Sequence, residues 1–580
     1  MAVAAGRPAG SPAEQPPEDA AATGDGVPVD LAADTAGRAA VGAAPAAAGN
    51  GPDGTATTGD ATTGTAPAGD GVNGSPPPWT VRIRSGRTRL LTAAVAGALP
   101  ALAFPAPSLW WLAYVALVPW MLLARSADSG RTAARDGWLG GAGFMLAVHH
   151  WLLPSLTVFL PVLALMLGAL WAPWGWLVRR LLGGRAGPAQ ALAAVLLLPS
   201  GWLMVELVRS WQYLGGPWGL LGASQWQVPA ALRLASLGGV WLVSFLVVLV
   251  NTCLAALVAA PALRRPAVAA LAAAGLATGS VWLWAPRPHA AGSVRVAVVQ
   301  PGVVATADAR FEREVRLTRQ LAGAHPDLVV WGESSVGQDL TTRTDMLHRL
   351  ASLSAEVGAD LLVNVDAEKA DGSGISKTSE LIGPRGVTGP EYDKMRLVPF
   401  GEYIPLRPVL GWATSVGKAA DQNRTPGRRQ VVMDTGRLRI GPLVCFESAF
   451  PDMSRHLADD GARLLVAQSS TSSFQHSWAP AQHASLAALR AAETWRPMVH
   501  ATLTGISAVY DADGRPVGRR IGTGASTAAV YQVPLATGQS PYARLGDWVP
   551  HLALVLVLSA LAYEVTRRVR GPERQEPPLV

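Results

Sequence analysis

Seven apolar stretches follow one another in the first half of the chain, and an eighth lies near its end. Several are close to the roughly 20 residues that an α-helix needs to cross a bilayer. Because lipid offers no partners to free backbone groups, a spanning segment of this kind folds as a helix. The pattern predicts a polytopic α-helical membrane bundle of about eight spans, at 89–105, 108–125, 137–154, 156–178, 188–208, 233–259, 266–285 and 547–567.

The composition agrees with a chain that is part membrane and part globular. Hydrophobic residues make up 49% and charged residues 15% of the 580 residues, which is too apolar for a typical soluble enzyme. Many of the 21 tryptophans stand at the edges of the apolar stretches, where interfacial anchors are expected. Residues 1–79 are rich in Ala, Gly, Pro, Thr and Asp, so we expect a disordered cytoplasmic tail there.

Arginines set the expected orientation. They cluster before the first stretch and after the second, fourth, sixth and eighth, whereas the short loops near 106 and 155 lack Lys and Arg. The positive-inside rule places the arginine-rich loops and both termini in the cytoplasm. We therefore predict a membrane domain with seven transmembrane helices at 80–285, an extracytoplasmic domain at 286–546, an eighth transmembrane helix at 547–567 and a cytoplasmic tail at 568–580.

The loop at 210–232 is rich in Gly and Trp and is too broken to span a bilayer. It either lies in the headgroup layer beneath the outer domain or simply connects two helices. Just before it, Glu206 and Arg209 stand three residues apart on one predicted helix. At this spacing the two side chains share a face, where the pair can neutralise itself.

Short β-rich runs alternate with helical stretches in the segment 286–546, which is typical of an α/β domain. Helices are expected at Arg310–Ala324 and Met346–Val357. A later pair of strands begins at Met498–Tyr510, with a turn at Asp511–Gly514. The other strands are expected at Val294–Gln300, Leu328–Trp331, Leu361–Val365, Ile440–Val444 and Leu464–Ala467.

Three polar residues in this domain form a candidate catalytic set. Glu333 follows the strand run that ends at Trp331, and Cys445 follows the run that ends at Val444. The ends of strands in an α/β sheet are where sites gather. A thiol attacks a carbonyl as thiolate, so it needs a base, and Glu333 can take its proton. Lys394 can offer a positive charge to the developing oxyanion.

Three further residues are expected to support this set. Glu402 and Glu447 can hold the lysine and shape its charge. The backbone N–H of Phe446 can serve as a second donor to the oxyanion. The remaining cysteine, Cys253, lies in an apolar stretch, so the thiol of Cys445 is not expected to form a disulfide.

The order of these residues and the sequences that flank them resemble those of the nitrilase superfamily, whose hallmark is a Glu, Lys, Cys triad on an αββα sandwich. Seven spans before that domain and one after it are similar to the membrane-bound branch, the apolipoprotein N-acyltransferase family, over about 89–567. The most specific sequence runs from Lys394 to Pro405 and includes Leu-Val-Pro-Phe-Gly-Glu-Tyr-Ile-Pro at 397–405. Pro-Trp-Gly-Leu-Leu-Gly-Ala-Ser-Gln at 217–225 also resembles that family.

The resemblance implies a phospholipid-dependent acyltransferase of the cell membrane that completes lipoprotein maturation by a ping-pong mechanism. Cys445 would take a fatty acyl group from a phospholipid as a thioester. It would then pass the group to the α-amine of a diacylglyceryl-modified N-terminal cysteine on an apolipoprotein. Three positions depart from the family's usual text: Phe446 replaces an aromatic hydroxyl, Phe311 a tryptophan, and the run at 468–473 an Asn-Asp-like text.

Two alternatives share the same residues. A membrane-tethered amidase or nitrilase-type hydrolase would pass the acyl group to water, although one span would suffice as its tether. The second alternative is a membrane paralogue without catalytic activity. The Ser-rich run at 468–473, which departs from the family's usual sequence, is compatible with this alternative. A transporter is disfavoured because the spans show no clear repeat and few ionisable residues. The arginine clusters indicate topology and not nucleic-acid binding, and no nucleotide or metal motif indicates a cofactor.

Overall fold

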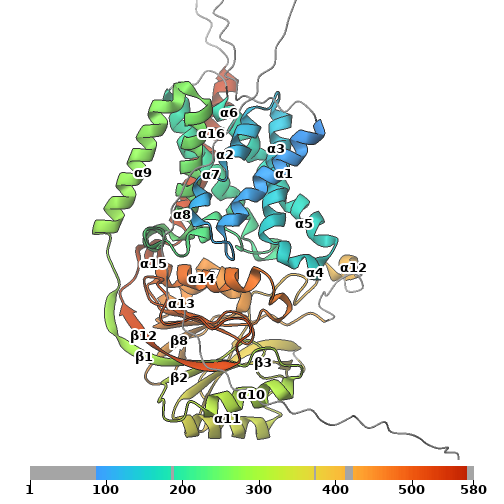
Figure 1. Cartoon of the computed structure of the whole chain (residues 1–580), viewed down its shortest axis with the longest axis vertical. Helices are drawn as coiled ribbons and strands as arrows, with labels where there is room; N and C mark the ends of the chain where they lie inside the picture. Colours follow the sequence, from blue (N-terminus) through green and yellow to red (C-terminus); the bar gives the residue numbers. More distant parts are fainter. Residues whose placement is uncertain (1–85, 184–187, 371, 373, 412–421, 571–580) are drawn as a thin grey trace, which may run out of the picture. The chain divides into compact units, whose positions relative to one another are not determined.

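The computed structural model describes residues 86–183, 188–370, 372, 374–411 and 422–570. The predicted tail at 1–79 and most of the predicted tail at 568–580 lie outside these residues. The described chain consists of a bundle of apolar helices and a sandwich of two β-sheets (Figure 1).

The bundle contains five helices that are long and apolar enough to cross a membrane, counted over the described residues. They cover 159–182, 189–209, 229–259, 261–284 and 548–569. The first three predicted stretches form shorter or more polar helices. The helix bounds are α1 Gly86–Ala98, α2 Val118–Arg125, α3 Gly130–Val148, α4 Leu153–Leu156, α5 Phe159–Gly168, α6 Ala172–Leu182, α7 Pro188–Arg209, α8 Pro229–Ala259, α9 Arg264–Trp284 and α16 Trp548–Arg570.

Sequence features explain why those three stretches are different. The first leaves the α-helical conformation after Ala98, where a 3₁₀ turn with Pro100 begins, because proline cannot donate to the helix ladder. The third, helix α3, carries Asp136, which is fully buried and pairs with Arg89 of α1 at 2.6 Å. Burying a charge is costly unless it is paired, so this arginine serves the interior of the bundle and not only its flank.

Four tryptophans fill the middle of the bundle instead of marking its edges. Trp120, Trp171, Trp174 and Trp202 are at most 2% exposed. Their rings meet edge to face, with centroids 5.1 to 5.9 Å apart, which is a favoured geometry for aromatic pairs. These four residues therefore belong to the interior of the bundle, and the expected anchoring by other tryptophans stays a prediction.

The first sheet of the sandwich has the strand order β12–β1–β2–β3–β4–β5, with β6 beside β4, and the second has the order β11–β10–β9–β8–β7. The central pairs β1–β2–β3 and β8–β9–β10 are parallel. The bounds are β1 His289–Gln300, β2 Leu328–Trp331, β3 Asp360–Glu368, β4 Ile375–Gly383, β5 Gly386–Val387, β6 Tyr392–Asp393, β7 Met433–Asp434, β8 Arg439–Val444, β9 Leu464–Ser469, β10 Met498–Thr502, β11 Ala508–Tyr510 and β12 Thr527–Thr537.

Four layers result from the alternation of side chains along the strands. In β1, Val296 and Val298 pack between the sheets, whereas Ala297 and Val299 pack against the outer helices, as the two-residue period of a strand requires. Helices α10 and α11 cover the first sheet, and α13 and α14 cover the second (Figure 1). The bounds are α10 Ala307–Arg319, α11 Thr344–Val357, α12 Arg407–Leu410, α13 Pro451–Asp459, α14 Ala479–Thr494 and α15 Pro541–Leu545. This is the αββα arrangement expected for the domain.

Each of the five expected strand runs lies within an observed strand. The predicted helix Arg310–Ala324 ends at Arg319 in the structure. It begins earlier than predicted, at Ala307, because Thr306 caps it by accepting a hydrogen bond from Ala309 N at 3.2 Å. The expected turn at Asp511–Gly514 is present but follows β11, and residues 503–507 join β10 to β11.

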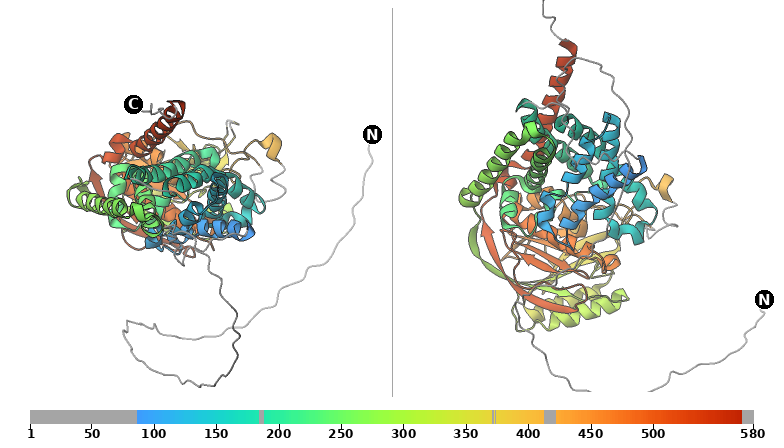
Figure 2. Two further views of the ribbon diagram at one scale, coloured as in Figure 1. Left: turned by 90° about the horizontal axis from the view of Figure 1, so that it is seen from above. Right: turned by 45° about the horizontal axis from the view of Figure 1, so that its top comes forward.

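Helix α14 joins the sandwich to the bundle. The indole N–H groups of Trp151 and Trp218 both donate to Gln482 Oε1, at 3.1 and 2.8 Å. Helix α8 bends at Gly238 and Gly239, and the helical stretch after the bend begins with Val240 N donating to Glu493 Oε1 at 2.7 Å. Figure 2 shows the bundle and sandwich from two further directions.

The loop at 210–232 is held from both sides. Arg209 Nη1 donates to the carbonyl of Trp218 at 2.6 Å, and Leu221 N donates to Glu206 Oε1 at 2.7 Å. Glu206 and Arg209 therefore each bind the loop, and their opposite charges also attract each other, as expected. Because Trp218 also reaches helix α14, the loop does more than connect two helices.

Candidate active site

The three residues of the candidate catalytic set meet at one edge of the sandwich. Glu333 comes two residues after β2, Lys394 directly after β6, and Cys445 directly after β8. Lys394 Nζ lies 3.1 Å from Glu333 Oε1 and 2.7 Å from Glu402 Oε1. Glu333 and Lys394 are at most 2% exposed. The fold thus brings together residues from both sheets that are more than a hundred positions apart.

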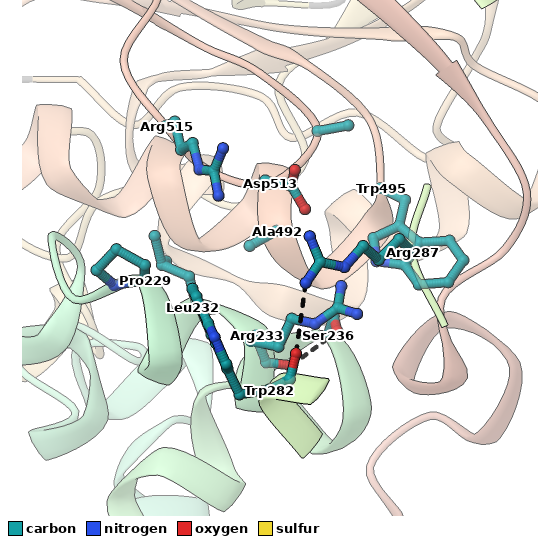
Figure 3. Close-up of a pocket in the computed structure, with 11 residues that line it drawn as sticks. Pro229, Leu232, Arg233, Ser236, Trp282, Arg287, Ala492, Trp495, Asp513 and Arg515 are labelled. Carbon is teal, nitrogen blue, oxygen red and sulfur yellow. Dashed lines mark hydrogen bonds between the residues drawn. The ribbon is translucent and has the colours of Figure 1, made fainter. Parts of the chain in front are cut away.

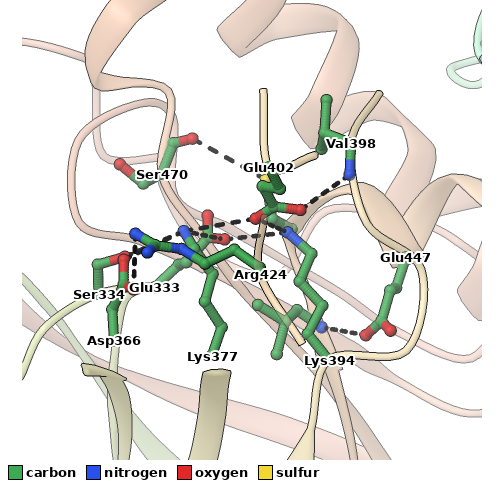
Figure 4. A network of polar contacts seen from close by, with 12 residues as sticks. Glu333, Ser334, Asp366, Lys377, Lys394, Val398, Glu402, Arg424, Glu447 and Ser470 are labelled. Carbon is green, nitrogen blue, oxygen red and sulfur yellow. Dashed lines mark hydrogen bonds and ion pairs between the residues drawn. The ribbon is translucent and has the colours of Figure 1, made fainter. Parts of the chain in front are cut away.

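A second lysine, which the sequence did not single out, binds the same carboxylate. Lys377 of β4 donates to Glu333 Oε1 at 2.9 Å and lies 3.6 Å from both Asp366 and Glu402 (Figure 4). Arg424 pairs with Asp366 at 3.1 Å on the outer side of the cluster. Three carboxylates and three cations therefore share this network, so its formal charge is zero.

The charges of the network fix the resting protonation state. Burial tends to raise the pKa of Glu333, but the charges of Lys377 and Lys394 and hydrogen bonds from Lys377 and the Cys445 thiol lower it to about 2. Burial raises the pKa of Cys445 to about 12, and the negative charge of Glu333 adds to this rise. The site therefore holds a carboxylate beside a neutral thiol, so the thiol would have to lose its proton to act as the predicted nucleophile.

Cys445, the predicted nucleophile, sits on a strained turn. Cys445 has a φ of +52°, a conformation that non-glycine residues rarely adopt and that is often kept at functional sites. His483 of α14 contacts the backbone of this turn, with its Nε2 2.9 Å from the carbonyl oxygen of Cys445. Burial lowers the pKa of His483 to about 4, so this histidine is neutral at physiological pH and acts as a hydrogen-bond donor to the backbone.

Glu447 ties the cysteine turn to the lysine loop. Its Oε1 accepts bonds from Tyr392 Oη at 2.8 Å and from Met395 N at 2.7 Å, and its Oε2 accepts one from Val444 N at 2.8 Å. The residue is fully buried. It was expected to hold Lys394 and shape its charge. Among the described residues, its hydrogen bonds go to backbone N–H groups and to Tyr392, whereas it interacts with Lys394 through their opposite charges.

A cavity of about 560 Å³ opens onto the thiol. Its polar end contains Glu333, Lys394, Glu402, Cys445 and Phe446, so five of the six predicted site residues line it and Glu447 supports it from behind. Its opposite wall is apolar and comes from the bundle, chiefly from Leu152, Leu156, Leu160, Leu163, Met166 and Leu167. The Ser-rich run contributes Ser470 to Ser473 to the rim.

Comparison with known proteins decides the family. Residues 96–253 match the model of the apolipoprotein N-acyltransferase N-terminal domain, and residues 295–541 match that of carbon–nitrogen hydrolase. An apolipoprotein N-acyltransferase of Geobacter metallireducens is 31% identical over 512 residues, which cover 82% of this chain and 96% of that protein. The chain belongs to the apolipoprotein N-acyltransferase family.

Other apolipoprotein N-acyltransferases are similar to this chain over comparable lengths. The protein of Azotobacter vinelandii is 32% identical over 514 residues, covering 84% of this chain and 96% of its own length. Among solved structures, an amidase of the nitrilase superfamily from Nesterenkonia aligns at 18% identity and a TM-score of 0.31, over 45% of this chain and 95% of its own. Membership in the apolipoprotein N-acyltransferase family confirms the predicted resemblance, the acyltransferase class and the carbon–nitrogen hydrolase fold of the sandwich.

Proposed function

We propose that this chain transfers a fatty acyl group from a membrane phospholipid to the α-amine of a diacylglyceryl-cysteine at the N-terminus of an apolipoprotein. The observation that carries this proposal is the single cavity that joins the Cys445 thiol to an apolar wall of bundle helices. A wall of this kind accommodates an acyl chain entering from the bilayer. The names of the relatives, apolipoprotein N-acyltransferases, point to the same acceptor.

The first half-reaction forms a thioester. Cys445 Sγ attacks the ester carbonyl carbon of the phospholipid as its proton passes to Glu333. Lys394 and the backbone N–H of Phe446 stabilise the oxyanion that forms. The ester C–O bond then breaks, and Glu333 returns the proton to the leaving oxygen of the lysophospholipid.

The second half-reaction forms the amide. The neutral α-amine of the lipoprotein cysteine attacks the thioester carbonyl and gives a proton to Glu333. The C–S bond breaks, and the proton returns to the sulfur of Cys445. The acyl group ends on the amine, and the enzyme regains its starting state.

Charge balance gives Lys377 a role in both steps. Glu333, Glu402 and Lys394 alone would carry a net charge of −1, and an oxyanion beside them would add another negative charge. Lys377 binds both carboxylates, so it frees part of the Lys394 charge for the oxyanion. Glu402, at 2.7 Å from Lys394 Nζ, keeps the ammonium in place.

Contacts at the far end of the bundle support the expected orientation. Arg180 of α6 pairs with Glu564 of α16 at 3.1 Å, and Arg179 donates to the carbonyl of Ala127 at 2.8 Å. These arginine-rich helix ends thus lie together, and they carry more arginines than the ends beside the sandwich, where Arg209, Arg233 and Arg287 stand. We infer a cell-membrane protein of about eight spans, the shorter apolar helices included, with both tails in the cytoplasm and the sandwich outside.

Intact-mass analysis of the purified protein in phospholipid micelles tests the proposal. The wild type and Cys253→Ala should both gain a mass equal to one fatty acyl group, whereas Cys445→Ala should gain none. Cys253 is a suitable control because it is a fully buried thiol inside the bundle. Addition of a diacylglyceryl lipopeptide should then move the acyl group to the peptide. Loss of the adduct to water alone, or no adduct with any donor, would refute the transferase.

A further inference from the structure

A second polar cavity lies at the junction of the bundle and the sandwich, and it shares no lining residue with the acyl cavity. Three arginines line it together with a single carboxylate, that of Asp513. Figure 3 shows the side chains of Arg233, Arg287, Arg515 and Asp513 facing one another across this space. The group therefore carries a formal charge of +2, and proposed acyl transfer does not use it.

The three arginines come from three separate parts of the chain. Arg233 lies in the first turns of α8, Arg287 in the link between α9 and β1, and Arg515 in the loop after β11. A ligand held by all three would join the bundle, the link and the sandwich. Guanidinium groups are well suited to such a ligand when it is a phosphate, because they bind its oxygens in pairs.

Arg233 has unused donor capacity inside the protein. Its side chain donates to the carbonyl of Ala285 through Nη2. The residue is only 7% exposed, yet its buried Nε finds no partner among the described residues. A buried polar group without a partner is costly, so the free protein bears a penalty at this side chain, which would fall if the guanidinium turned toward a bound anion.

The neighbouring helix indicates what brings the anion there. Helix α9 is long enough to cross a membrane, but only 6% of its apolar window is buried, and Ala267 is its one buried residue in the described chain. It leans away from the other helices toward its C-terminal end (Figures 1 and 2). Trp282 and Trp284 stand at that end and are 39% and 76% exposed, as expected for residues at the headgroup layer.

We propose that the exposed Arg287 and Arg515, together with the buried Arg233, bind a phosphate group at the mouth of this cavity, at the membrane surface. A phospholipid whose chains lie along α9 supplies the phosphate at the right depth, and inorganic phosphate offers the same oxygens without chains. Bound phosphate links α8, the start of β1 and the loop after β11, so it stabilises the contact between bundle and sandwich. The site is separate from the acyl-donor site and does not depend on the catalytic proposal.

Native mass spectrometry and thermal unfolding of the full-length protein in phosphate-free detergent test this site. Three probes separate the sources of binding: phosphatidylglycerol, diacylglycerol with the same chains, and inorganic phosphate. Phosphatidylglycerol should bind and raise the unfolding temperature, and diacylglycerol should not. If inorganic phosphate has the same effect at equal concentration, the phosphate site stands and the chains add nothing to it.

Variants with opposite expected effects make the test sharp. Arg287→Gln and Arg515→Gln change exposed side chains, and each should weaken phosphatidylglycerol binding about tenfold. Asp513→Asn removes the opposing carboxylate and should strengthen it. Arg519→Gln, an exposed arginine outside the lining, is the matched control and should change nothing. Equal stabilisation by diacylglycerol, or unchanged binding in both arginine variants, would overturn the proposal even if acyl transfer is intact.

Discussion

Replacing Lys377 by methionine removes one cation from the candidate active site while keeping most of the side-chain volume. Lys377 Nζ lies 2.9 Å from Glu333 Oε1 and is one of two lysines that lower the pKa of this carboxylate to about 2. An opposite charge at this range typically lowers a carboxyl pKa by about 1–3 units. In Lys377→Met we therefore expect the pKa of Glu333 to rise to about 3–5.

Two effects on the rate oppose each other. Glu333 becomes a stronger base, but only about half of that gain reaches the transition state of a proton transfer. The oxyanion loses a nearby positive charge, which contributes about 4 kcal/mol at 4 Å and about 2 kcal/mol at twice that distance in a medium of dielectric constant 20. The loss of charge outweighs the gain in basicity, so thioester formation at pH 7 should slow about tenfold.

The pH profile identifies the cause. Activity requires ionised Glu333, so the wild type should show a flat rate from pH 7 down to pH 4, and Lys377→Met should lose activity as the pH falls through about 3–5. The free energy of unfolding should also fall as the pH is lowered. A depressed pKa in the folded state stabilises the protein above the ordinary pKa, and this contribution disappears as the pH falls through the folded-state pKa. In Lys377→Met this stabilising contribution of Glu333 should be smaller and should disappear at higher pH, because the pKa of Glu333 is less depressed.

The assay is single-turnover acylation of the protein by phospholipid, followed by intact mass between pH 4 and pH 8. Lys369→Met is the matched control. Lys369 pairs with Asp393 at 2.9 Å and is not among the described residues that line the acyl cavity. If Lys377→Met has the wild-type profile at both ends of this range, the charge-balance argument is wrong.

Three further changes test other parts of the site. Glu447→Gln loses acceptors for several buried N–H and O–H donors and should lower the unfolding free energy by about 1–3 kcal/mol, measured by denaturant titration in detergent. In Gly216→Ala the new Cβ would lie 2.6 Å from an aromatic ring of the nucleophile turn, so acylation should fall more than in Gly215→Ala, which meets only backbone strain. Leu160→Trp should lower kcat/KM for long-chain donors about tenfold relative to donors two carbons shorter, and the lipid-facing Leu192→Trp should leave the ratio unchanged.

Glu333 and Cys445 each follow a short β-rich run, and Lys394 begins the distinctive sequence that ends at Pro405. Because these are short local patterns, the sequence singled out all three residues and predicted the ends of β2 and β8. It did not reveal Lys377, which lies within a strand where lysine usually faces solvent. This lysine reaches Glu333 only because β4 pairs with β3, which pairs with β2, and such pairing is not visible in local sequence.

Five of the eight predicted stretches match long apolar helices among the described residues, but the packing of the bundle was not predicted. Hydropathy detects a stretch such as α8 because its apolar residues are consecutive. Hydropathy cannot distinguish a tryptophan at the interface from one in the middle of the bundle, such as Trp202, because both occur within similar apolar stretches. It also cannot show that Glu206 and Arg209 each hold the loop, because those partners are backbone groups of a segment without a regular pattern.

Support from the bundle for the nucleophile distinguishes the transferase from a tethered hydrolase. The Cys445 turn is held from the sandwich side by Glu447 and His483. From the bundle side, the loop containing Gly216 packs against the same turn. A thiol whose pKa is about 12 reacts only when it is aligned with its base. Because the bundle contacts this turn and also forms the apolar wall of the cavity, we infer that it is part of the proposed reaction centre, which a hydrolase that uses the membrane only as an anchor would not require.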